Sequence, residues 1–134
     1  MSVEIRPEFH PPIRGLVYQA EGKALADRIQ SIHTFSRKRG IRPITDFLDN
    51  RDMPDDDVDP DESEAARSDW YSPTEGLQAV RALVQAIQSD SKIAQRWNKD
   101  DPDAVETLLD DLEELARCLE VAAAREAQFR LEVG

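Results

Sequence analysis

The sequence has 134 residues, of which 28 are acidic and 17 basic, and its formal net charge is −11 at pH 7. Binding to nucleic acid or to anionic membranes needs clustered Lys and Arg, so this charge argues against both kinds of partner. The single cysteine excludes an intrachain disulfide, and no apolar run reaches the roughly 20 residues of a membrane span or forms a signal peptide. We therefore expect one domain, residues 1–134, in the reducing cytoplasm.

Both ends of the chain alternate apolar and polar side chains, a pattern typical of half-buried strands. Residues 3–9 form the first such segment, which Pro7 either ends or confines to a sheet edge. Residues 128–133 form the second. Because neither strand is stable alone, we predict that they pair as a small ribbon packed on a helix. The side chains predicted to share its apolar faces are Val3, Ile5, Phe129, Leu131 and Val133.

Helical spacing of apolar residues covers about residues 16–39, although Gly22 weakens the first half, so the helix starts either near residue 16 or only at Gly22. Three basic residues at 37–39 suit the negative end of the helix dipole, and Gly40 can adopt the left-handed cap conformation. A short helical turn over 44–48 is expected next.

Residues 49–69 are strongly acidic, with ten acidic residues against two arginines and a net charge of −8. Such a segment buries too little apolar surface to offset its ordering entropy, so we predict a long solvated acidic loop. A calcium-binding EF-hand loop that began at Asp55 would need Gly at its sixth position and Glu at its twelfth. Those positions hold Pro60 and Ala66, so no metal site is predicted there.

Two further helices are marked by their starting residues. Ser72-Pro73-Thr74-Glu75 has the pattern of a capping box and predicts a helix to about Gln88. Asp101 is the expected cap of a last helix, which continues for about five turns. Between them, a short turn places Trp97 in the core. The apolar stripes of the two helices are Leu77, Val80, Leu83, Val84 and Ile87, then Val105, Leu108, Leu109, Leu112, Leu115, Leu119 and Ala122 or Ala123.

Together these segments predict a mainly α fold. We expect a three-helix-type bundle that carries a terminal two-stranded β ribbon and a long acidic loop. Two of the helices have broad apolar faces, which is compatible with a homodimer.

No motif identifies a catalytic residue, a cofactor-binding residue or a metal ligand. Cys118 lies beside the leucine stripe, where cysteine usually behaves as a small buried hydrophobe. Acidic residues of the last helix fall opposite the leucines and are expected to face solvent, with Glu113 and Arg117 spaced for an i,i+4 ion pair. These acidic residues are Glu106, Asp110, Glu113 and Glu114.

The aromatic pair Trp70-Tyr71 follows the acidic segment. One interpretation is an anchor, in which the indole of Trp70 is buried and fastens the end of the acidic segment to the helices; the other is a partly exposed binding hot spot. Arg81 either joins that patch or packs its aliphatic stem along the core edge. The candidate partner-binding residues are Trp70, Tyr71, Arg81, Asp55, Asp56, Asp57 and Asp59.

The leading functional hypothesis is a non-enzymatic protein-interaction domain of the adaptor, regulatory or immunity type, with a basic protein as partner. The alternative is an enzyme or small-molecule-binding protein whose site is assembled from distant residues. A deep pocket that brought together at least three of the residues considered for such a site would favour this alternative. Mimicry of DNA is disfavoured, because the negative charge is concentrated in one segment. The residues considered for an assembled site are His10, His33, Arg42, Trp70 and Arg81.

Overall fold

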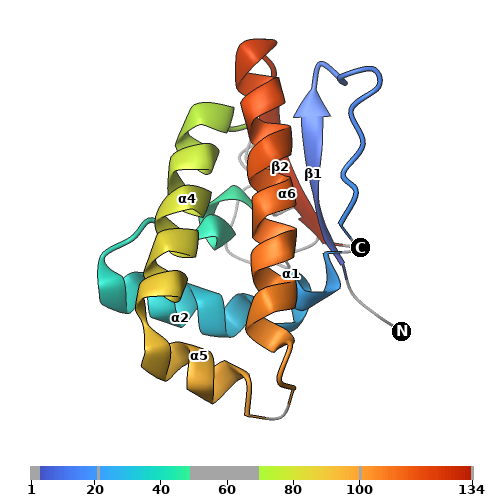
Figure 1. The fold of residues 1–134 in the computed structure, drawn as a ribbon. Helices are drawn as coiled ribbons and strands as arrows, with labels where there is room; N and C mark the ends of the chain where they lie inside the picture. Colours follow the sequence, from blue (N-terminus) through green and yellow to red (C-terminus); the bar gives the residue numbers. More distant parts are fainter. Residues whose placement is uncertain (1–3, 21, 49–69, 100, 134) are drawn as a thin grey trace, which may run out of the picture.

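The computed structural model describes residues 4–20, 22–48, 70–99 and 101–133. Within these ranges the chain is mainly helical and carries one two-stranded antiparallel sheet, as predicted (Figure 1). The three-helix bundle is not confirmed, because the described residues contain five α-helices and a 3-10 helix. The acidic segment 49–69, including the four candidate aspartates, lies outside the described residues. The elements in order are β1 (Ile5–His10), α1 (Lys23–Asp27), α2 (Ile29–Arg39), η1 (Ile44–Phe47), α4 (Pro73–Ser89), α5 (Ser91–Trp97), α6 (Ala104–Ala124) and β2 (Gln128–Val133).

The ribbon joins the two ends of the described chain. Ile5 lies opposite Val133 and Pro7 opposite Leu131, so β1 continues through the proline. Proline lacks an N–H donor and is tolerated here because β1 is an edge strand. Leu131 is buried, whereas Val133 is 45% exposed, so the apolar face of the ribbon ends before the strand does.

The helix predicted over residues 16–39 begins at α1 and is broken in two. Gly22 has a left-handed φ of 76°, and its carbonyl accepts a hydrogen bond from the Ile5 N–H at 3.2 Å. A Cβ at this position would lie 2.3 Å from the Ile5 carbonyl oxygen, so only glycine allows this contact. The break falls at Arg28, whose side chain donates to the Trp97 carbonyl at 2.7 Å. Gly40 ends α2 in the left-handed conformation, as predicted.

The two long helices, α4 and α6, lie side by side, and α6 crosses in front of β2 (Figure 1). The predicted leucine stripe of α6 is confirmed as core except for Leu109, which is half-buried. The N-cap residue of α6 is Asp103 and not the predicted Asp101. The buried face of α4 is rotated from the predicted one, since Leu77 and Val84 are only half-buried. No helix in the described ranges is long and apolar enough to cross a membrane. The buried residues of α4 are Pro73, Gly76, Ala79, Val80, Leu83 and Ile87.

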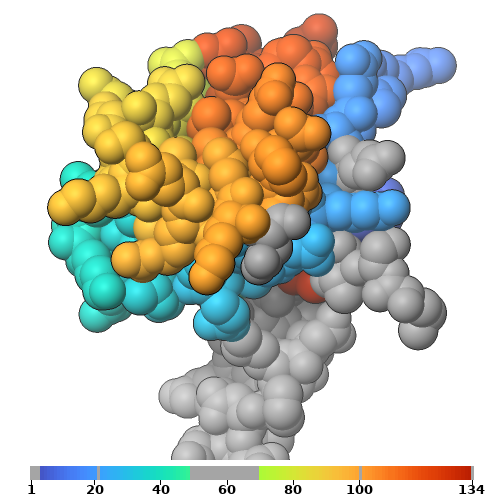
Figure 2. Space-filling model, turned by 60° about the horizontal axis from the view of Figure 1, so that its bottom comes forward, coloured from blue at the N-terminus to red at the C-terminus, as the bar shows by residue number. Residues whose placement is uncertain are grey.

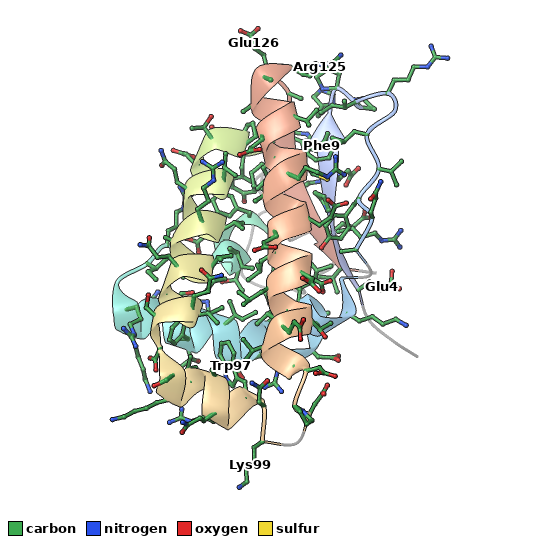
Figure 3. The ribbon with its side chains drawn as sticks, viewed as in Figure 1. Glu4, Phe9, Trp97, Lys99, Arg125 and Glu126 are labelled. Carbon is green, nitrogen blue, oxygen red and sulfur yellow. The ribbon has the colours of Figure 1, made fainter. Side chains whose placement is uncertain are left out.

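Half of the predicted capping box is present at the start of α4. The Glu75 N–H donates to the Ser72 Oγ at 3.5 Å, but the Glu75 carboxylate lies 3.4 Å from Arg42. Trp97 is buried where α5 meets the other helices, which confirms its predicted place in the core (Figure 3).

Candidate interaction site

Residues that flank the acidic segment on both sides form bridges to β2. On the near side, Leu48 forms a parallel bridge with Leu131. On the far side, Tyr71 forms an antiparallel bridge with Phe129, with N–H···O distances of 2.8 and 2.9 Å. The described chain on the two sides of the acidic segment therefore contacts β2 at positions two residues apart.

The Tyr71 side chain belongs to an aromatic cluster inside the fold. Its ring meets Phe47 of η1 edge-on, with the centroids 5.3 Å apart. The Phe129 ring lies 5.2 Å from Phe47 and 6.5 Å from Tyr71. Because aromatic rings in such clusters gain both burial and edge-to-face contact, Tyr71 acts as an anchor for the chain that follows the acidic segment.

Trp70 points to the opposite, polar face of the ribbon, as expected for consecutive residues in an extended chain. Its ring stacks on His10 with a centroid distance of 5.1 Å, and the Arg130 guanidinium lies 4.1 Å from the Trp70 centroid. Arg130 also donates to Glu8 at 3.0 Å. We call His10, Trp70 and Arg130 the ribbon stack. Its tryptophan is half-buried, so part of the indole faces solvent.

Arg81 lies in a different place. It pairs with Glu120 across a groove between α4 and α6, and the volume of this groove is about 350 Å³. Both side chains of the pair are more than half exposed, so the pair contributes at most about 1 kcal/mol to stability. The structure thus separates Arg81 from the ribbon stack and places it on the surface of the two long helices.

The residues considered for an assembled active site are distributed over the molecule. His10 and Trp70 are in ring contact. His33 lies 2.7 Å from the Thr45 hydroxyl, and Arg42 lies over the Phe47 ring. In the described parts of the chain, no group of three or more His, Cys, Asp or Glu side chains is arranged to hold a metal ion.

A buried carboxylate on α6 was missed by the sequence analysis. Asp111 is 5% exposed, and its Oδ2 accepts a hydrogen bond from the Leu25 N–H at 3.2 Å. Leu25 is in the first turn of α1, whose cap, Gly22, has no side chain, so Asp111 caps this helix from outside. The Asp111 carbonyl also accepts from the Tyr18 hydroxyl at 3.1 Å. Burial, together with the nearby Asp111 charge, raises the pKa of Tyr18.

Residues 11–20 cross the outside of α6, where Glu114 and Arg117 hold them. Glu114 accepts from the Gln19 N–H at 2.6 Å, and Arg117 donates to the Val17 carbonyl at 2.8 Å. Arg117 pairs with Glu114, so the predicted pairing with Glu113 is wrong. Glu114 was expected to face solvent, but its side chain is only 14% exposed because this segment covers it.

Cys118 lies next to this contact and is fully buried, as predicted. Burial raises the pKa of its thiol, although the nearby Arg117 guanidinium lowers it. The net effect of burial favours the neutral thiol over the thiolate.

The contacts of Glu114 are expected to make the stability of the protein depend on pH. Hydrogen bonds from Arg117 and the Gln19 N–H lower the pKa of Glu114 below its ordinary value of 4.5. Its stabilising effect is therefore complete above that value and is lost as the pH falls through the lowered, folded-state pKa. Glu114→Gln should reduce the free energy of unfolding by about 1 kcal/mol at neutral pH, and the difference should vanish in acid. Urea unfolding from neutral to acidic pH measures this, with the exposed neighbour Glu113→Gln as control. An unchanged difference at low pH would contradict the role of the charge.

Comparisons with protein families, with curated proteins and with solved structures each found no match to this chain.

Proposed function

We propose that this chain is a non-enzymatic protein-interaction domain whose acidic segment, residues 49–69, contacts a basic partner protein in the cytoplasm. The observation that carries the proposal is that Leu48 and Tyr71, which flank this segment, both bridge to β2, beside the half-buried Trp70. Residues 49–69 carry a net charge of −8 out of a total of −11.

This arrangement suits recognition in two steps. Concentrated charge steers an oppositely charged protein toward one place and increases the association rate, an effect that salt weakens. The indole of Trp70 is held by His10 and Arg130, so it loses little side-chain entropy when a partner covers it. Aromatic residues fixed in this way are common among the residues that dominate binding energy. This mode of action suits an adaptor, a regulatory or an immunity-type protein, and the identity of the partner distinguishes these three classes.

The test is affinity capture from the native host at low ionic strength, followed by binding measurements with the captured protein. A neutralised segment should bind at least about tenfold more weakly, because the charges that attract the partner are gone. The neutralised variant carries Asp55→Asn, Asp56→Asn, Asp57→Asn and Asp59→Asn, and these four changes reduce the net charge from −11 to −7.

The matched control removes four negative charges from exposed positions elsewhere, so its net charge is also −7. It should bind like the unmodified protein if the location of the charge matters, and its own loss of binding would contradict the proposal. Trp70→Ala should weaken binding by about 2 kcal/mol, mainly through faster dissociation. If Trp70→Ala bound the partner as tightly as the unmodified chain does, the indole would not be part of the interface with the partner. The control substitutions are Glu106→Gln, Asp110→Asn, Glu113→Gln and Glu126→Gln.

A further inference from the structure

The surface formed by α2 and α5 has the opposite charge from the rest of the protein. These two helices contain five basic residues and no acidic residue, in a chain where acidic residues outnumber basic ones by 28 to 17. They lie side by side on one face of the molecule, at the bottom of Figure 1, and Figure 2 turns this face toward the viewer. The basic residues are Arg37, Lys38, Arg39, Lys92 and Arg96.

A groove of about 310 Å³ runs between the two helices. Lys38 from α2 and Arg96 from α5 contribute the cations of its lining, and Ser31 and Thr34 add hydroxyl groups. Its apolar part comes from the half-buried Ile93 and from the edges of two aromatic rings, Phe35 and Trp97. The groove therefore combines uncompensated positive charge, hydrogen-bonding groups and a small apolar area.

The two aromatic rings that line the groove are each contacted by an arginine that is not part of the lining. Phe35 and Trp97 meet edge-on with their centroids 5.8 Å apart. The Arg28 guanidinium lies 5.8 Å from the Trp97 ring and donates to the Trp97 carbonyl, and Arg39 lies over Phe35 while pairing with Asp90. Arg28 and Arg39 thus have structural partners and fix the shape of the groove.

Lys38 and Arg96 differ from these two arginines. In the part of the chain that the structure describes, neither has a carboxylate within the 4.0 Å of an ion pair. Their charges add in the groove, because no acidic residue occurs in either helix to offset them. A carboxylate that entered the groove would therefore gain charge-assisted hydrogen bonds from both helices without displacing an existing partner.

We propose that the groove between α2 and α5 binds an acidic peptide segment of a partner protein, with carboxylates at Lys38 and Arg96 and one apolar side chain against Ile93 and the ring edges. A protein segment fits better than nucleic acid. The Phe35 and Trp97 rings are only 7% and 4% exposed, so neither offers a face on which a base could stack. The net charge of −11 also opposes a long polyanion, whereas a short segment interacts mainly with the groove itself.

This surface is separate from the ribbon stack and has the opposite polarity, so the proposal does not depend on the proposed function. The neutralised acidic segment tests the function, and the groove variants below test this site alone. Either proposal can fail while the other holds.

The experiment uses the full chain and a fluorescein-labelled peptide, Asp-Glu-Asp-Leu-Glu-Asp-Glu, titrated by fluorescence anisotropy at an ionic strength of about 0.15 M, where the Debye length is about 8 Å. Binding should weaken with added salt and should weaken at least about tenfold in the double variant Lys38→Glu/Arg96→Glu, which reverses both groove charges. Replacing the peptide's leucine with serine should also weaken binding, because the apolar contact is lost. Amide chemical-shift changes on adding the peptide should be concentrated in α2 and α5.

The matched control is Arg37→Glu/Lys92→Glu. Its residues are on the same two helices, next to Lys38 or in the first turn of α5, but they do not line the groove. This control makes the same change in net charge, and its affinity should stay within about threefold of the unmodified chain, since exposed charges farther away are screened. Equal losses in both double variants would overturn the proposal, because binding would then follow net charge and not the groove. So would equal affinity for the serine peptide, or tighter binding of a labelled oligothymidylate of the same charge.

Discussion

Asp111→Ala should lower the free energy of unfolding by about 2 to 3 kcal/mol. The substitution removes the carboxylate that accepts the Leu25 N–H and leaves a buried donor at the start of α1 without its partner. Hydrogen bonds to charged groups are among the strongest in proteins, and a helix end without a cap is destabilised further. Urea unfolding followed by far-UV circular dichroism measures the change at neutral pH.

The neighbouring residue supplies the control. Asp110 is exposed on the same helix, so Asp110→Ala removes the same charge without opening a buried site and should change stability by less than about 0.5 kcal/mol. Asp111→Asn keeps a side-chain oxygen that can accept the same hydrogen bond and should fall between the two alanine variants. If the two alanine variants were equally stable, the cap from α6 would make no net contribution to folding.

Gly76→Ala should destabilise the protein by about 2 kcal/mol, although alanine is the better helix former. A Cβ at Gly76 would lie 2.2 Å from the Phe129 Cζ, far inside normal contact distance. The ring cannot turn aside freely, because it is 1% exposed and packed against Phe47. Either α4 or the ribbon must therefore shift, and thermal or urea unfolding reports the cost.

A double-mutant cycle separates this overlap from other effects of the substitution. In a Phe129→Leu background the smaller side chain leaves room for the new methyl group. There, Gly76→Ala should be neutral or should stabilise α4 by up to about 1 kcal/mol, as expected from helix propensity. If the cost in the leucine background equalled that in the unmodified chain, the contact with the ring would not be its cause.

Local signals in the sequence predicted the boundaries of several elements well. The alternation over residues 128–133 coincides with β2, and Gly40 ends α2 in the left-handed conformation. The leucine stripe of α6 is buried as its spacing indicates, with the exception of the half-buried Leu109. Each of these features depends on interactions between residues close in sequence, where periodicity and capping preferences are reliable guides.

Features that depend on contacts between distant segments could not be predicted in the same way. The apolar pattern of α4 favoured Leu77 and Val84, whereas the ring of Phe129 selects the side with Gly76 and Ala79. Asp111 does follow Leu108 by three residues and so falls on the apolar face, which was an available signal. Its partner, however, is 86 residues away and cannot be found from spacing alone.

The two residues of the Trp70-Tyr71 pair differ in their contacts. Tyr71 packs inside the fold as an anchor does, whereas the indole of Trp70, which the anchor interpretation buries against the helices, is only half-buried and lies on the ribbon. The prediction that Arg81 joins a patch with Trp70 and Tyr71 depended on the closeness of these residues in the sequence. The intervening turns of α4 direct Arg81 toward Glu120 on α6 instead.

The antiparallel pairing of β1 with β2 has a consequence for synthesis on the ribosome. Ile5 can pair with Val133 only after all the described helices have been translated. Until then β1 has no strand partner. Closure over so long a separation carries a large entropic cost, which favours helix packing before strand pairing. The last step of folding would then seal the domain by joining its earliest and latest segments.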